Sequence, residues 1–208
     1  MSDKIECLLR KAEAQEQSSS PEQSSVTSAG RNFLTNEEAE AAFSRLEEKL
    51  FHIKNWNNAS GASSYELFDA NGDNRLDNAM TIGDFIRISL KGALKYDWVK
   101  IIEIYRSSNE IVLTVQPTFN PTEDNTNESV TSHFFNDQAT NNFCLEKTDK
   151  SLKFYVIGLN EKTNTLETKG LLETIRNLAT ANIGSYLGIQ KGEWKTFCEQ
   201  FLEIENQK

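Results

Sequence analysis

The stretch TIGDFIRISLKGALKYDWVKIIEIYRSSNEIVLTVQ, Thr81–Gln116, contains successive strand-like runs separated by short turn signals. Apolar residues of one parity over 82–90 predict a strand with one buried face. Trp98–Tyr105 is apolar on both parities except at Lys100 and Glu103, which predicts a strand covered on both sides. Ile111–Val115 forms the next run. The connections are too short for the crossover that parallel strands need, so we expect an antiparallel meander.

More sheet and then helix follow this stretch. Phe143–Lys147 and Leu152–Leu159 have the pattern of a hairpin around a short polar turn. Apolar residues at helical spacing then predict two C-terminal helices, one over 171–187 and one over 194–202. We expect the first to end at the glycines of 184–188, because glycine commonly terminates helices.

The N-terminal part combines a strong helix signal with a weak one. Thr35-x-x-Glu38 matches a capping box, which predicts a surface helix behind it. Residues 3–17 also have helical spacing, but Ser18–Gly30 is rich in serine and interrupted by proline, which predicts a flexible linker. We therefore expect a flexible tail over 1–30, whose short amphipathic helix either frays or docks on a partner.

These patterns together predict an α+β fold with a single domain over 31–208. We expect a curved antiparallel sheet or partial barrel of five to six meander strands. One N-terminal helix and two C-terminal helices should pack on it.

Composition restricts the partners and the compartment. The net charge of the 208-residue chain is −9, and an excess of carboxylates disfavours nucleic acid and anionic membranes as partners. The three cysteines are far apart and form no CxxC pair, which indicates a reducing compartment. The N-terminus lacks the apolar core of a signal peptide, and no run approaches the length of a membrane span, so we expect a cytoplasmic protein.

The segment 69–80 fits part of the pattern of a calcium loop, and calcium is the one cofactor that the sequence raises. Loop positions 1, 3, 5 and 9 are occupied by Asp69, Asn71, Asp73 and Asp77. The expected glycine at position 6 is Asn74, however, and the bidentate glutamate at position 12 is Met80. An Asn-Gly hairpin turn therefore explains the segment better than a metal site does.

A catalytic candidate lies in the long polar segment 117–142, a length that is typical of functional or disordered loops. His133 and Asp137 would meet if their segment forms one helical turn, and a carboxylate-held histidine is half of a general-base arrangement. Nothing nearby supplies a nucleophile. The competing interpretation is that His133 is a loop residue held by its aromatic neighbours.

Aromatic side chains raise the prospect of a ligand pocket, because a curved sheet closed by helices can enclose an apolar cavity. The candidate lining residues are Trp98, Tyr105, Phe119, Phe134, Phe135 and Tyr155. The alternative is that these residues fill a solid core.

Two classes of function follow. The first is a non-catalytic cytoplasmic binding or adaptor protein, acting on a protein partner through the tail and the 117–142 loop. The alternative is a protein with a pocket for an apolar small molecule, including a hydrolase-like enzyme that uses His133.

Overall fold

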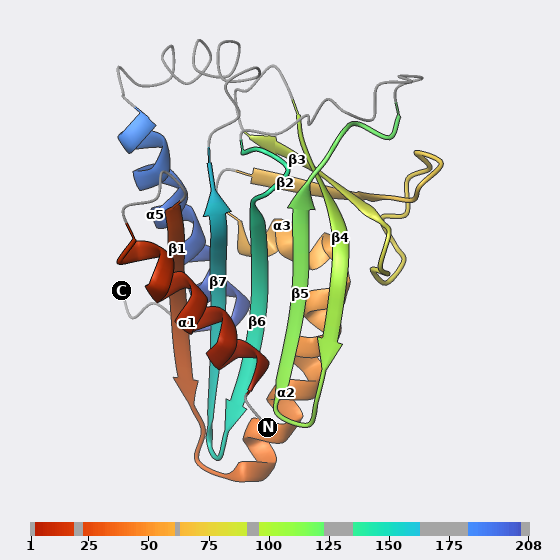
Figure 1. Ribbon diagram of the computed structural model, residues 1–208. Coiled ribbons are helices and arrows are strands. Elements are labelled where there is room, and N and C mark those ends of the chain that lie inside the picture. Colours follow the sequence, from red (N-terminus) through yellow and green to blue (C-terminus); the bar gives the residue numbers. More distant parts are fainter. Residues whose placement is uncertain are drawn as a thin grey trace.

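A curved antiparallel sheet organises the structure, a computed structural model that describes residues 3–18, 23–60, 63–90, 96–122, 135–162 and 183–204, without the side chains of 90 and 183–191. The seven strands lie in the order β1-β7-β6-β5-β4-β3-β2, and helices cover both faces (Figure 1). The strands are β1 (Gln23–Asn32), β2 (Ser63–Phe68), β3 (Phe85–Leu90), β4 (Asp97–Arg106), β5 (Glu110–Pro117), β6 (Thr140–Thr148) and β7 (Ser151–Glu161). The helices are α1 (Lys4–Glu16), α2 (Asn36–Phe51), η1 (Ile53–Asn55), α3 (Trp56–Ala59) and α5 (Ile183–Phe201).

The α+β class and the curved antiparallel sheet are as predicted, but the sheet has seven strands rather than five to six. The additional strand is β1, which pairs with β7 from Gln23 to Asn32. Its sequence is mostly small and polar, which an edge strand tolerates because one of its sides faces solvent. The expected flexible linker over Ser18–Gly30 is therefore a strand from Gln23 onward. β1 crosses the boundary expected at residue 30, and the division into domains itself stays a prediction.

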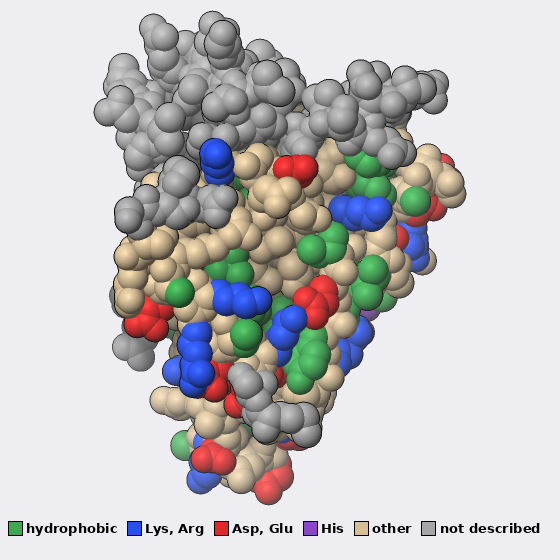
Figure 2. All heavy atoms as spheres, in the orientation of Figure 1, with side chains coloured by type: hydrophobic (Ala, Val, Ile, Leu, Met, Phe, Trp, Pro, Cys, Tyr) green, Lys and Arg blue, Asp and Glu red, His purple; other side chains and the backbone are tan. Residues whose placement is uncertain are grey.

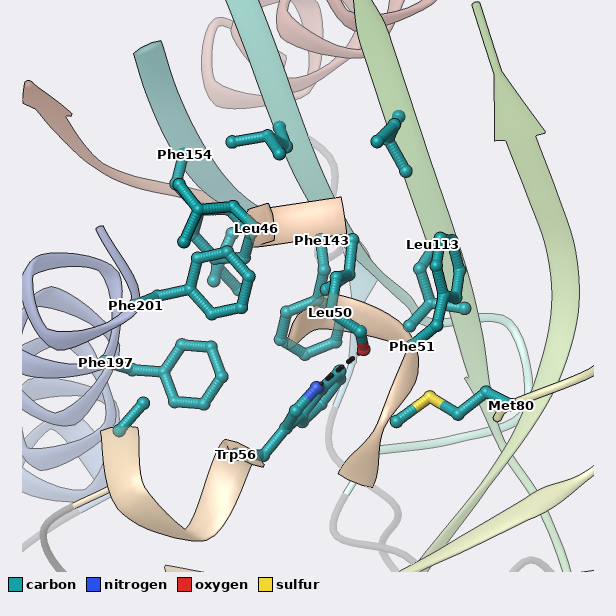
Figure 3. Packing of buried hydrophobic residues seen from close by; sticks show 14 of the residues in the cluster. Leu46, Leu50, Phe51, Trp56, Met80, Leu113, Phe143, Phe154, Phe197 and Phe201 are labelled. Carbon is teal, nitrogen blue, oxygen red and sulfur yellow. Dashed lines mark hydrogen bonds between the residues drawn. The ribbon is translucent and has the colours of Figure 1, made fainter. Parts of the chain in front are cut away.

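The inner face of the sheet, which is turned toward α2, α3 and α5, carries the main core (Figure 3). Trp56 lies at its centre, 4.5 Å from Phe143 and 5.5 Å from Phe197 between ring centroids. The indole Nε1 of Trp56 donates a 2.9 Å hydrogen bond to the carbonyl of Leu50. Phe201 stacks on Phe154 at 4.1 Å. Side chains thus fill the space between the sheet, α2 and the C-terminal half of α5.

The start of α2 shows the predicted capping box in a slightly shifted form. Thr35 Oγ1 accepts from the Glu38 backbone N–H at 3.2 Å, as expected. Glu38 Oε2 accepts in turn from the backbone N–H of Leu34 at 3.0 Å. The first bond pairs a free amide of the first helical turn, and the second pairs the amide of the residue before the N-cap.

The outer face of the sheet is covered by α1, which differs from the frayed or partner-bound helix expected from the sequence (Figure 1). Ile5, Leu8 and Ala12 are buried on this face, in one cluster with residues of β5, β6 and β7. The carboxylate of Glu110 accepts from the backbone N–H groups of Lys4 at 2.9 Å and Ile5 at 3.3 Å. A short helix that is marginal alone is thus stabilised by tertiary packing.

The C-terminal helix α5 continues through Gly184, Gly188 and Gly192, so the helix end predicted at 184–188 is wrong. Interior glycines cost only about 1 kcal/mol each, and tertiary packing can override them. The helix ends at Phe201 instead, and the left-handed residue Glu203 follows with a φ of 56°, while Ile204 N–H donates to the Glu199 carbonyl. Most of the first predicted C-terminal helix lies outside the described residues. No helix in the described part of the chain has the length and apolarity that a membrane span requires.

Candidate functional site

The inner face changes from apolar to polar between two neighbouring rows of paired residues. In one row Val156, Phe143 and Leu113 lie opposite one another on β7, β6 and β5, and all three belong to the core. Two residues further along each strand, side chains point to the same face again. That next row contains Ser25 of β1, Gly158 of β7 and Asn141 of β6, which we call the polar row.

Gly158 leaves space in the polar row that Glu161 occupies. A Cβ added at Gly158 would overlap the Glu161 Oε1 and lie 2.6 Å from Ser25 Oγ. The Glu161 side chain therefore takes the place of a residue-158 side chain, directly opposite Asn141. Glu161 is only 7% exposed, which is unusual for a carboxylate.

An irregularity of β7 at Asn160 accounts for the Glu161 side chain folding back over the sheet. Asn160 has a φ of 55°, and the pairing of β1 with β7 shifts register at this point. Gln15 at the end of α1 holds Asn160: its Oε1 accepts from the Asn160 backbone N–H at 3.1 Å, and its amide donates to Asn160 Oδ1. Asparagine tolerates this left-handed conformation better than most residues. The outer helix thus fixes the position of an inner-face carboxylate.

Asn141 is the unusual member of the polar row. Its Oδ1 is buried and has no hydrogen-bond partner among the residues that the structure describes. Leaving a buried acceptor unpaired costs about 1–3 kcal/mol, so such groups call for an explanation. Directly opposed side chains of an antiparallel pair have their Cβ atoms about 4.5–5.5 Å apart. The oxygens of Asn141 and Glu161 therefore share one small region of the inner face.

Trp194 of α5 packs on the core row that adjoins the polar row, beside Phe143. Its ring lies 5.6 Å from Phe143 and 5.7 Å from Phe197, in edge-on contacts with both. Phe143 is the apolar neighbour of Asn141 along β6, two residues away. The polar row thus adjoins a wall of aromatic rings, which is the combination of apolar surface and few polar groups typical of ligand sites.

The aromatic residues proposed from the sequence as a pocket lining separate into different clusters. Tyr105 and Tyr155 pack together under α1 on the outer face. Trp98 belongs to another cluster, with Phe68 and Phe85, against which Phe119 packs. Phe135 is buried, and Phe134 lies outside the described residues. A ligand-lining role for these residues stays a prediction.

Tyr155 links β7 to β6 within its cluster. Its hydroxyl donates a 2.8 Å hydrogen bond to Glu146, and burial raises its pKa well above the ordinary tyrosine value, with Glu146 adding to the shift.

His133 of the proposed catalytic pair lies outside the described residues. Asp137 is exposed, and its backbone carbonyl accepts from the Gln116 side chain at 2.6 Å. The general-base hypothesis stays a prediction.

The segment proposed for calcium forms a turn held by its own first carboxylate. Asp69 Oδ1 accepts from the backbone N–H groups of Asn71 at 2.8 Å and Asp73 at 3.1 Å, and Gly72 has a φ of 82°. Asp77 lies near Lys54 at 3.5 Å. In the described ranges, no three or more acidic, histidine or cysteine side chains are grouped as a metal site would need. Calcium binding by this segment stays a prediction.

Two open clefts elsewhere are lined by residues with structural partners. A cleft of about 620 Å³ contains Glu110, which caps α1, and Lys147, which pairs with Glu40. A second cleft of about 560 Å³ contains Lys49, which donates to the Phe201 carbonyl, and Glu203, which pairs with Arg45. These groups already have hydrogen-bond or ion-pair partners within the fold, whereas the Asn141 Oδ1 has none among the described residues. The polar row is therefore the better candidate site.

Sequence reasoning did not single out the polar row. Asn141 falls in the predicted loop 117–142, whereas β6 already begins at Thr140. Gly158 did carry a signal, because a glycine inside a strand pattern often marks a bulge or a close approach. The partner that fills its space, Glu161, could not be named from the chain alone.

The fold resembles known structures, although no family model and no curated protein matches the chain. A hypothetical protein of Helicobacter pylori is similar with a TM-score of 0.50 and 8% identity, over 89% of each chain. A protein of Thermus thermophilus reaches a TM-score of 0.43 with 12% identity, over 86% of this chain and 95% of its own. Norcoclaurine synthase from Thalictrum flavum, solved with dopamine and hydroxybenzaldehyde, reaches 0.40 with 9% identity, over 90% and 91%. The first likeness shows a shared fold alone, and the lower scores of the other two carry no argument.

Proposed function

We propose that this protein binds a small, mainly apolar molecule on the inner face of the sheet, where the polar row adjoins α5. The observation that carries the proposal is the buried Asn141 Oδ1, which has no partner among the described residues. A bound molecule that donates a hydrogen bond to this oxygen would remove the cost of burying it. Trp194 and Phe143 offer aromatic surface beside it.

An adaptor function finds less support. The tail that was expected to recruit a partner packs on the sheet of its own chain, with Ile5 completely buried. On the face that carries α1, cationic, anionic and apolar side chains are interspersed rather than gathered by kind (Figure 2). A protein partner for the 117–142 segment stays a prediction.

The proposal is tested with aminoanthracene, a planar apolar fluorophore whose emission rises in apolar surroundings. We expect saturable binding to the wild-type protein. Ser25→Phe places a ring on the inner face within the polar row and should weaken binding at least about tenfold, or about 1.4 kcal/mol.

The matched control is Ser28→Phe, on the same strand but on the opposite face, where Ser28 is exposed. It should leave the affinity unchanged within about twofold. Thermal unfolding of both variants verifies that they are folded. The proposal fails if the wild-type protein does not bind the fluorophore, or if Ser25→Phe binds as well as Ser28→Phe.

A further inference from the structure

We infer that the molecule bound at the polar row is apolar but carries a hydrogen-bond donor, as an aromatic amine, amide or alcohol does. The inference rests on the proposed function and deepens it by naming the chemical class of the ligand. It follows from the kinds of atoms that face the site.

The polar row presents acceptors side by side. Asn141 contributes a buried amide oxygen, and Glu161 contributes a carboxylate in the position opposite it. An ionised carboxylate accepts hydrogen bonds and donates none. A ligand N–H or O–H that reaches Asn141 Oδ1 would satisfy the amide and lie in the field of the carboxylate. A donor that also reached the Glu161 carboxylate would make a charge-assisted bond there, which is stronger than a neutral one.

The same atoms disfavour ligands without donors. An ether or hydrocarbon would leave Asn141 Oδ1 unpaired, so binding would not remove the existing cost. A carboxylate, such as that of a fatty acid, would also bring a second negative charge beside Glu161. Like charges in a buried site repel strongly because little water screens them. The net charge of −9 acts in the same direction.

The acceptors are held in place before any ligand binds. Glu161 follows the left-handed residue Asn160, and Gln15 of α1 holds that residue by hydrogen bonds to its backbone and side chain. Asn160 Nδ2 also donates to the Gln138 carbonyl at 3.3 Å. Because these hydrogen bonds already hold the segment that carries Glu161, ligand binding requires little further ordering of the protein. Such a preorganised site can select among ligands.

Three probes with the same ring system test the inference: aminoanthracene, anthracene and anthracene carboxylate. The wild-type protein should prefer the amine over anthracene at least about fivefold, the lower limit for pairing a buried acceptor. The carboxylate should bind most weakly. Asn141→Leu should still bind anthracene but lose the preference, because the acceptor is replaced by an apolar group of similar size. Asn141→Gln keeps a neutral amide oxygen in this region and should keep the preference.

The outcomes separate the two proposals. If the wild-type protein binds none of the probes, the proposed function fails and the inference fails with it. If amine and hydrocarbon bind equally well, or the carboxylate binds best, a ligand site exists but the donor class is wrong. Persistence of the preference in Asn141→Leu would also overturn the inference. Should Asn141→Leu fail to fold, the comparison of probes on the wild-type protein and on Asn141→Gln decides by itself.

Discussion

Cys144 can report whether α1 opens as an independent unit. Its thiol is completely buried on the outer face, in the same cluster as Ile5 and Leu8 of α1. Burial raises its pKa far above the ordinary cysteine value, so the thiol should react only when the helix leaves the sheet. Cys198 is buried on the inner face and serves as an internal reference for global unfolding.

Replacing Ile5 by alanine should raise the labelling rate of Cys144 selectively. Ile5 is 0% exposed, and truncating a buried isoleucine costs about 2–5 kcal/mol. If the whole cost appears in the opening equilibrium of α1, the rate rises at least about 30-fold, since 1.4 kcal/mol is a factor of ten. The labelling rate of exposed Cys7 sets the upper limit. Cys198 should react at its wild-type rate.

The measurement is alkylation under native conditions, with each cysteine followed by mass spectrometry of peptides. Glu6→Ala is the control, because it removes only the exposed pair with Arg10, worth about 0.3–0.5 kcal/mol, and should change the rate less than about threefold. An unchanged Cys144 rate in Ile5→Ala would refute the idea that α1 protects this thiol. Equal acceleration of Cys144 and Cys198 would show that α1 opens only with the whole protein.

Two further predictions concern the polar row and the end of α5. Gly158→Ala should lower the free energy of unfolding by about 1–3 kcal/mol, because the new methyl group overlaps Glu161. Gly30 is the control site, because a Cβ there would meet Lys153 and Leu152 at ordinary contact distances. Gly30→Ala should therefore be neutral or stabilising by up to about 1 kcal/mol in urea unfolding, and equal effects at both sites would contradict this view of the row. Glu203 is partly buried, which would raise its pKa, but the hydrogen bond and charge of Arg45, together with Lys49 and Arg31, bring the pKa below the ordinary glutamate value. A carboxyl group with a lowered pKa stabilises the fold above its unfolded-state pKa of about 4.3, and this stability is lost as the pH falls through the folded-state pKa. Glu203→Gln should therefore lose less stability on acidification than the wild-type protein or the exposed control Glu48→Gln. Identical acid profiles of the three proteins would count against the network.

The features predicted from the sequence are those that depend on short-range pattern. The strand over 98–105 and the hairpin around 148–150 follow from local apolar runs and turn residues, and the structure has both. The helix behind Thr35 follows from its cap and its apolar stripe, and it is α2. The signals lie within a few residues of one another, so no knowledge of the rest of the chain is needed.

β1 and α1 differ from what local composition indicates, because their stability comes from distant partners. A serine-rich segment has the composition of a linker, yet Gln23–Asn32 gains its hydrogen bonds from β7. The helix Lys4–Glu16 has few apolar residues, and they are buried by strands that come much later in the chain. Composition measures what a segment can bury by itself, and neither segment stands by itself.

The candidate site likewise depends on contacts between segments that are distant in the chain. Sequence patterns alone determined an acidic α+β protein with an antiparallel sheet and apolar helices. Tertiary structure alone decided that Ser25, Asn141 and Glu161 share one region. β1 pairs with β7 although the two strands are far apart in the chain, and the Glu161 side chain fills the space at Gly158, the partner of Asn141. Whether a polar group needs a hydrogen-bond partner also depends on its surroundings. In the sequence Asn141 is an ordinary polar residue, and only the burial of its oxygen beside aromatic rings gives a reason to expect a ligand.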